Sequence, residues 1–356
     1  MLIYIIVLLL IVFMHKSYVK TLSISIPRQW KTEINERKYL LAVCIILILL
    51  LALRGDLVGL DTIPYKNLLL DKMDRPLKDI LQTERHEPLY LTLNYLIHFT
   101  GSFFLLKLSI AVIFVVGTMS MVYKYSHSTV VSCLFFFMYG FLYLGFNEMR
   151  QAVATGVVCF SFQYLVEKQL WKYLLGVTIA YFFHYSAVVM LPLTALIWID
   201  KVNFKYFFAI LAFLYFAFAN STTLFMYVNE FSSIEYNIDE NTGGWGLLIF
   251  QLFILFLGFT KRKELSEERW NVCAFFCIGF AVAMFPLCHT LPTMFRLEKY
   301  ACIPMIIFVP NMISKFENKI LRNCIYLLFI AVGLYFAFTQ SYTEYNQTLP
   351  YYFFWE

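Results

Sequence analysis

The stretch "NEMRQAVATG" (147–156) closes one apolar run, "VVSCLFFFMYGFLYLGF" (130–146), and opens another, "AVATGVVCFSF" (152–162). Such runs are typical of membrane helices, so Arg150 is expected at the mouth of one. A charge at mid-membrane costs on the order of 2.5 kcal/mol or more, and even at the rim a Gln or Ser would cost less. We therefore expect a negatively charged group beside Arg150.

The whole chain has the composition of a membrane protein. Of its 356 residues, 61% are hydrophobic and 14% are charged, whereas soluble domains carry about 25% charged residues. The net charge of +5 is spread over short loops, which indicates membrane orientation and not nucleic-acid binding. The eight cysteines fall mostly in apolar runs without metal-ligand spacing, so we expect buried thiols and no metal site.

These features predict an all-α polytopic membrane protein, a single membrane domain over 1–356 with about 11–13 transmembrane helices. Only helices satisfy so many backbone groups in lipid without a strictly alternating pattern. The apolar segments are 1–14, 39–53, 88–99, 103–122, 128–146, 149–166, 171–183, 186–199, 204–220, 245–260, 270–288, 299–313 and 321–339.

Charge in the loops predicts the orientation. Loops rich in Lys and Arg are expected in the cytoplasm, and these are 167–172, 200–205, 261–269 and 314–322. Loop 221–244 has four acidic residues and no Lys or Arg, so it is expected outside, either as a lid over a site or as a solvated connection. The alternation then places Arg150, Arg296 and His184, at the tip "FFHYSA" (182–187), on the outer side.

The side of loop 54–86 depends on segment 88–99. If 88–99 spans the membrane, the loop is cytoplasmic; if it does not, the loop lies outside with Arg150. The segment has 12 residues, including Asn94 and His98. Lengths of about 10–14 residues favour a re-entrant or interfacial helix. We therefore expect a short re-entrant helix near 88–99 and an outer loop 54–86.

Two further stretches carry polar residues at helix ends. "LRGDLVGLDTIPY" (53–65) is a turn-rich loop with Arg54, Asp61 and Tyr65, and "HEPLY" (86–90) opens a helix after Glu87. Taken singly, each has an ordinary explanation. Asp61 and Glu87 suit turns or helix caps, and Arg54 suits an interfacial anchor.

Together, the motifs "RGDLVGLDTIPY", "HEPLY", "NEMRQAVA", "FFHYSA" and "FRLEKY" resemble those of the EpsG family of polysaccharide polymerases, relatives of the Wzy-type O-antigen polymerases. The resemblance covers roughly residues 40–310, and the region of Arg296 matches less closely. The matching positions are Arg54, Gly55, Gly59, Asp61, Tyr65, Glu87, Pro88, Asn147, Arg150, Gln151, Ala154, Phe183, His184, Ser186 and Ala187.

The resemblance implies an enzyme of the bacterial plasma (inner) membrane, a glycosyltransferase that joins oligosaccharide repeat units carried on a polyprenyl diphosphate. The growing chain is the donor, and it is moved onto a hydroxyl of the incoming lipid-linked unit at the outer face. Membrane lipid, a flippase and a chain-length regulator are the further partners to expect. No cofactor is expected.

The residue types suit this chemistry. A diphosphate leaving group needs cations, and the fork of arginine matches phosphate oxygens in pairs, so we expect Arg-stabilised, metal-independent transfer. Arg150 is the leading candidate, with Arg54 and Arg296 as partners. His184 is the expected base because imidazole titrates near neutral pH, or it is a hydrogen-bonded turn histidine. The other expected substrate-binding residues are Asp61, Tyr65, Glu87, Gln151 and His289, the last as a reserve base.

Three other functions remain open from the sequence. A flippase or another transporter would place ionisable residues along a path at the membrane midplane. A membrane O-acyltransferase would use an intramembrane His with a donor from the cytoplasm. A polysaccharide ligase would share the fold and the leaving group, and sequence alone does not separate it from a polymerase.

Overall fold

The computed structural model describes residues 2–20, 28–220, 223, 226, 244–290, 294–341 and 347–356. Within these ranges the chain forms 18 helices and no strand, so the predicted all-α membrane fold is confirmed. Three helices are long and apolar enough to cross a membrane: α6 (Phe103–Tyr125), most of α15 (Arg269–Thr290) and most of α18 (Lys319–Ser341). Seven further apolar helices are shorter.

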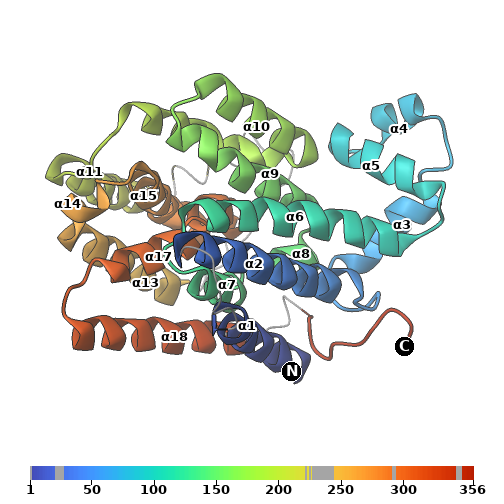
Figure 1. The fold of residues 1–356 in the computed structure, drawn as a ribbon. Helices are drawn as coiled ribbons and strands as arrows, with labels where there is room; N and C mark the ends of the chain where they lie inside the picture. Colours follow the sequence, from blue (N-terminus) through green and yellow to red (C-terminus); the bar gives the residue numbers. More distant parts are fainter. Residues whose placement is uncertain are drawn as a thin grey trace.

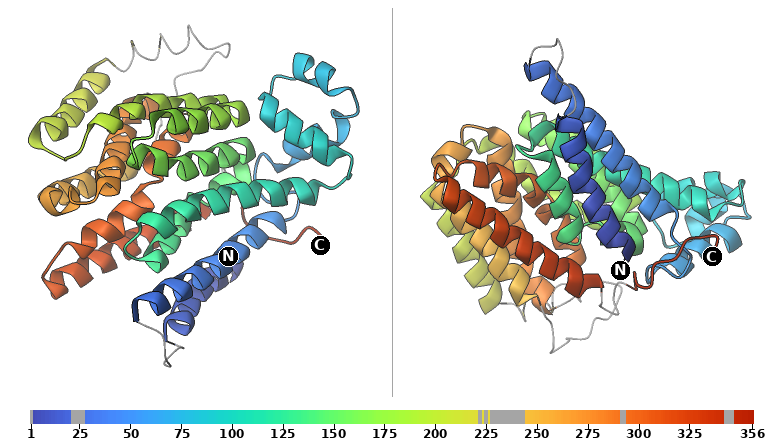
Figure 2. Two further views of the ribbon diagram at one scale, coloured as in Figure 1. Left: turned by 45° about the horizontal axis from the view of Figure 1, so that its top comes forward. Right: turned by 60° about the horizontal axis from the view of Figure 1, so that its bottom comes forward.

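The N-terminal half is a row of packed helices (Figures 1 and 2). It runs from α1 (Leu2–Lys20) through α2 (Arg28–Ala52), α6 and α9 (Met149–Val166) to α10 (Leu170–Phe183), each in contact with the next. Small residues let α6 and α9 approach closely, because a Cβ on Gly156 would lie 2.5 Å from the carbonyl oxygen of Ile113. The helix α9, which carries Arg150, is thus held between α6 and α10.

The C-terminal half packs beside this row. It contains the 3₁₀ helix η1 (Tyr185–Trp198), α11 (Phe204–Ala219), α13 (Trp245–Thr260), α14 (Arg262–Leu265), α15, α16 (Phe295–Cys302), α17 (Met305–Ser314) and α18. The helix α15 contacts α11, α13, α16 and α17 and so forms its centre.

Two predicted segments are divided in the structure. Segment 128–146 becomes α7 (Thr129–Met138) and α8 (Tyr143–Asn147), separated by a turn in which Gly140 has a φ of +81°. Segment 299–313 falls on α16 and α17, with Pro304 between them. In both cases a residue suited to a turn interrupts a run that hydropathy alone reads as continuous.

The predicted loop 54–86 contains two helices, α3 (Thr62–Asp71) and α4 (Leu77–Thr83), and α5 (Pro88–His98) follows. These three helices lie together at one end of the row of helices (Figure 1). Loop 221–244, the possible lid, lies outside the described residues apart from 223, 226 and 244.

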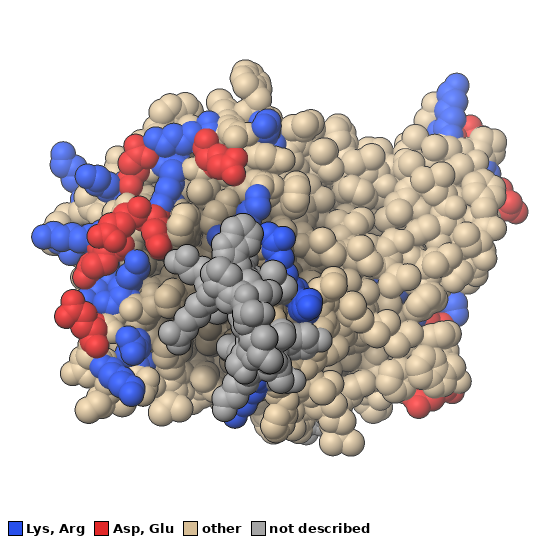
Figure 3. Space-filling view, viewed as in Figure 1, with Lys and Arg blue, Asp and Glu red and all other residues tan. Residues whose placement is uncertain are grey.

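Charged side chains are unevenly spread over the face in Figure 3. Most of them lie over its left part, several Lys or Arg lie near its centre, and a few charged residues lie at its right edge. A broad expanse without Lys, Arg, Asp or Glu lies between the centre and the right edge. An apolar surface bounded by charged helix ends is what a membrane-embedded helical protein presents. The chain is a multi-pass membrane protein whose charged side chains lie mostly at helix ends.

Candidate functional site

The carboxylate of Glu87 joins two of the predicted site residues. Its Oε2 lies 2.8 Å from the NH1 of Arg150, and its Oε1 lies 2.7 Å from the Nδ1 of His184. The backbone N–H of Tyr185 also donates to Oε1, at 3.2 Å. Glu87 is 2% exposed and makes no capping hydrogen bond to α5. The residue is therefore the centre of a cluster built from the starts of α5 and α9 and the end of α10.

The charge of Glu87 follows from these partners. Burial alone would raise its pKa, but the hydrogen bond from His184 and the positive charge of Arg150 lower the pKa to about 2. An ionised carboxylate only accepts hydrogen bonds, so the Nδ1 of His184 carries a proton. In the neutral imidazole the other nitrogen, Nε2, then holds the lone pair.

Tyr65, on α3, also lies beside Arg150. Its phenol interacts with the guanidinium, which is bonded to Glu87 through NH1. Tyr65 is buried and its ring meets that of Tyr90 edge to face. Within the protein, the negatively charged group beside Arg150 is Glu87. The side chain of Arg150 is 24% exposed, so part of it is still accessible from outside the protein.

A second cluster adjoins the first through the start of α9. The guanidinium of Arg296 lies 3.5 Å from the carboxylate of Glu148 and 4.0 Å from that of Asp61. The Nζ of Lys299 lies 3.3 Å from the same Glu148 oxygen. The side-chain amide of Gln151 donates to the carbonyl of Arg296. Four of these five residues come from two quoted motifs, "NEMRQAVATG" and "FRLEKY".

The two cations of this second cluster are open to a ligand. The side chain of Arg296 is 47% exposed and that of Lys299 is 31% exposed. Asp61 precedes α3 without capping it, and burial raises its pKa while Arg296 lowers it. Sequence analysis missed Glu148 and Lys299, although both stand within three residues of a predicted arginine.

Arg54 occupies a different place from the other predicted arginines. It is 1% exposed, and its guanidinium donates to the backbone carbonyls of Leu51 and Phe146. Its partner Lys107 was not predicted: this buried lysine of α6 donates to the carbonyl of Arg54 and lies 3.6 Å from Asp56. The structure brings neither of these cations to the Glu87 carboxylate in the first cluster.

The turn after Arg54 is shaped by Gly59. Its φ is +100°, and a Cβ there would lie 2.5 Å from the carbonyl oxygen of Phe146. The next residue, Leu60, donates its N–H to the Oδ1 of Asn147 at 2.8 Å. The motif residues Gly59 and Asn147 therefore dock this loop against the start of α9 and bring Asp61 to Arg296.

His289 lies in the last turn of α15, among aromatic rings. Its ring stacks on Phe285, with 5.8 Å between centroids, and meets Trp245 at 4.9 Å. Within the part of the chain that the structure describes, no group of three or more His, Cys, Asp and Glu residues is placed to hold a metal ion.

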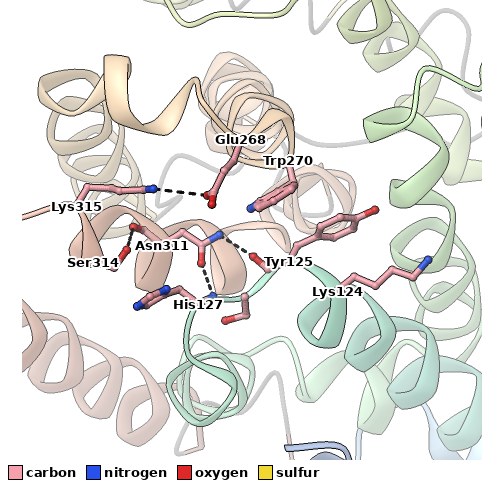
Figure 4. Close-up of a pocket in the computed structure, with 9 residues that line it drawn as sticks. Lys124, Tyr125, His127, Glu268, Trp270, Asn311, Ser314 and Lys315 are labelled. Atoms are coloured by element: carbon pink, nitrogen blue, oxygen red, sulfur yellow. Dashed lines mark hydrogen bonds and ion pairs between the residues drawn. The ribbon is translucent and has the colours of Figure 1, made fainter. Parts of the chain in front are cut away.

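A polar pocket lies at the other end of α6 (Figure 4). Its volume is about 210 Å³, and Asn311 spans one wall by donating to the carbonyl of Tyr125 and accepting from the N–H of His127, at 2.7 and 2.6 Å. Lys315 and Glu268 face each other across it at 3.8 Å. Because α6 begins beside the Glu87 cluster and ends here, the two polar regions occupy opposite ends of the helix.

Comparison with known proteins gives one match. The sequence model described as the EpsG family matches residues 37–353. Searches of curated proteins and of solved structures find no match. The matched range contains both charge clusters and the loop that carries Arg54.

Proposed function

Because the chain belongs to the EpsG family, we propose that it is a polymerase that joins polyprenyl-diphosphate-linked oligosaccharide repeat units at the outer face of the bacterial plasma membrane. The observation that carries the proposal is the Glu87 carboxylate, which holds a histidine and an arginine from two other helices. A base and a cation side by side are what transfer of a sugar from a diphosphate to a hydroxyl requires.

His184 is the proposed base. Its Nε2 takes the proton from the acceptor hydroxyl while the oxygen of that hydroxyl bonds to the anomeric carbon of the growing chain. Glu87, on Nδ1, orients the ring and stabilises the imidazolium that forms, as a carboxylate does for the histidine of a hydrolase triad. The bond from the anomeric carbon to the diphosphate breaks, and its electron pair leaves with the lipid diphosphate.

The leaving diphosphate is the proposed ligand of Arg150, Arg296 and Lys299. Glu87, Glu148 and Asp61 are their counter-ions within the protein. Arg296 and Lys299 are the more exposed cations, so they offer the first contact to the diphosphate, and Arg150 faces the charge that develops next to the base. Arg54 has a positioning role in this scheme, because its guanidinium binds backbone carbonyls.

The remaining expected residues bind sugar or support the cations. Asp61 and Tyr65 lie next to Arg296 and Arg150, respectively, and Gln151 ties α9 to α16. The gathering of these groups at one end of the helices favours an enzyme over a transporter, which would need an ionisable path through the midplane. A flippase that delivers the units and a chain-length regulator are the proposed partners.

The test is analysis of lipid-linked sugars from cells that carry wild-type protein, Arg150→Ala or Arg150→Lys. We expect single repeat units to accumulate on lipid in Arg150→Ala and little recovery in Arg150→Lys, because an ammonium cannot serve Glu87, Tyr65 and a diphosphate together. Arg75→Ala is the matched control, since Arg75 forms an exposed ion pair with Glu84 on α4. Long chains in Arg150→Ala at wild-type levels would refute the role of Arg150.

A second experiment tests whether His184 acts as the base or as a binding residue. His184→Ala should slow transfer by about 100-fold or more while donor binding changes little. His127→Ala, at the other end of α6, is the control and should transfer normally. Weakened donor binding with an unchanged rate of transfer would make His184 a binding residue. If this protein moved finished chains onto a different acceptor while another enzyme still polymerised the single units, the protein would be a ligase.

A further inference from the structure

The C-terminal segment, residues 347–356, runs along the loop that follows α2. The N–H of Gly55 donates to the carbonyl of Tyr352 at 2.9 Å, and the N–H of Phe354 donates to the carbonyl of Leu53 at 3.0 Å. These reciprocal bonds form one antiparallel bridge, the pattern by which two extended strands pair. Two segments about 300 residues apart in sequence are therefore hydrogen-bonded backbone to backbone.

Two more bonds extend this pairing along the loop. The hydroxyl of Tyr352 accepts the N–H of Leu57 at 2.7 Å, and the carbonyl of Gln347 accepts the N–H of Gly59 at 2.9 Å. The C-terminal segment thus accepts from three backbone donors of the loop. Gly55 and Gly59 are buried, and buried backbone donors need partners, so the loop depends on this segment for its conformation.

The C-terminal segment is itself anchored to the helices. The hydroxyl of Tyr351 donates to the carbonyl of Leu50 at 2.9 Å, and the hydroxyl of Tyr4 donates to the carbonyl of Thr348 at 3.0 Å. Both Tyr4 and Thr348 are buried. The segment is therefore packed between the start of α1 and the end of α2.

The ring of Tyr352 also fits a residue without a side chain. A Cβ on Gly55 would lie 2.0 Å from Cε2 of that ring, and the three atoms nearest to it all belong to the ring. Glycine is thus needed at position 55 because Tyr352 packs against it. The two positions form a pair whose fit can be tested by substitution.

The loop held in this way leads directly to the second charge cluster. Leu60 is docked on Asn147, and Asp61 follows next to Arg296. A displacement of the loop would separate Asp61 from Arg296. Arg296 and the other cations proposed to receive the diphosphate would then shift as well. The matched family range ends at residue 353 and so includes Tyr352.

We infer that the C-terminal segment is a positioning element of the site, with Tyr352 as its central residue. It holds the loop from Leu53 to Gly59 so that Asp61 meets Arg296. The inference rests on the proposed function for its effect on activity, and on the backbone contacts alone for its effect on structure.

The test is a double-mutant cycle with Gly55→Ala and Tyr352→Ala, read out both as polymer formed from lipid-linked units and as unfolding temperature of the purified protein in detergent. Gly55→Ala alone should lower polymer formation about tenfold, because the new methyl group collides with the ring. The double variant should recover to about the level of Tyr352→Ala alone. Gly246→Ala is the control, because nothing lies within 4 Å of a Cβ there.

The readouts separate the two proposals. Coupling in both measurements supports the positioning role. Additive effects on the unfolding temperature would refute the contact itself, and coupling on unfolding with additive effects on polymer would refute the positioning role. If the proposed function were wrong, the unmodified protein would form no polymer, a result on which the unfolding cycle does not depend.

Discussion

At the scale of single residues, Glu87 organises the site because both of its oxygens are used. One holds Nδ1 of His184 and the other holds the guanidinium of Arg150, with the carboxylate 2% exposed. Removing one partner of a buried charge pair is strongly destabilising, whereas replacing the carboxylate by an amide keeps the shape and removes the charge. The packing of α5, α9 and α10 therefore depends on the ionisation of the Glu87 carboxyl.

The pH dependence of stability tests this link. The pKa of Glu87 is lowered from 4.5 to about 2 in the folded chain, so the carboxylate contributes stability above about pH 4.5 that is lost as the pH falls towards 2. We expect the unfolding temperature of the purified protein to fall steeply across this range and the fall to be shallower in Glu87→Gln. Glu317→Gln, at an exposed position before α18, is the control. Equal slopes in wild type and Glu87→Gln would contradict the assignment.

The residue types of the site were predictable, but their pairing was not. Periodicity and loop charge placed Arg150 and His184 at the same end of neighbouring helices, and the motif brought Glu87 into consideration. The partners, however, are separated by 63 and 97 residues, and their contact depends on how α5 docks on α9 and α10. Arg54 illustrates the converse, since a helix-end arginine can turn inward to carbonyls as readily as outward to a ligand.

At the scale of helices, the position of α9 determines where the cations of the two clusters lie. Its first turn carries Glu148, Arg150 and Gln151 in or beside the two clusters, and its flank packs on α6 at a crossing of two glycines. A Cβ on Gly117 would lie 2.1 Å from the carbonyl oxygen of Gly156. Close helix approach of this kind depends on small residues because lipid provides no hydrophobic drive between helices.

Gly156→Val tests the role of this crossing. Overpacking of a tight contact costs about 1–3 kcal/mol, so we expect a lower unfolding temperature and reduced polymer, since α9 would move with respect to α5 and α10. Gly246→Val, at an open position of α13, should leave both measurements near wild type. A variant at position 156 as stable and active as wild type would show that the crossing can open without moving the site.

At the scale of the whole molecule, the structure gathers the polar groups into two regions. The Glu87 and Glu148 clusters, α3 to α5 and the C-terminal segment lie at one end of α6, and the Asn311 pocket lies at the other (Figures 1 and 4). The placement of loop 54–86 on the same side of the membrane as Arg150 stays a prediction. The side of the membrane on which each region lies is a prediction from loop charge.

Single-cysteine labelling tests that orientation. In a background without the exposed Cys324, single cysteines are introduced at position 61, which is half-buried, and at the exposed positions 355 and 127, and are treated with a membrane-impermeant thiol reagent. We expect labelling of 61 and 355 from outside intact cells, and labelling of 127 only after the membrane is opened. Labelling of 61 and 355 from opposite sides would contradict the packing of the C-terminal segment, and labelling of both only from inside would contradict the outward-facing site.

Hydropathy and loop charge were enough to predict a helical membrane protein and the polar residues at its helix ends. Hydropathy and charge act locally, so they are readable without the fold. They did not reveal the breaks at Gly140 and Pro304, the helices within 54–86 or the burial of Lys107.

The contacts between distant segments became known from the folded structure. It placed Glu87 between His184 and Arg150, joined Lys299 and Arg296 through Glu148, and laid residues 347–356 along the loop of Arg54. Such contacts depend on side-chain packing between helices far apart in sequence, and no local pattern encodes them. The residue types indicated the chemistry, whereas the fold brings these residues together into a site.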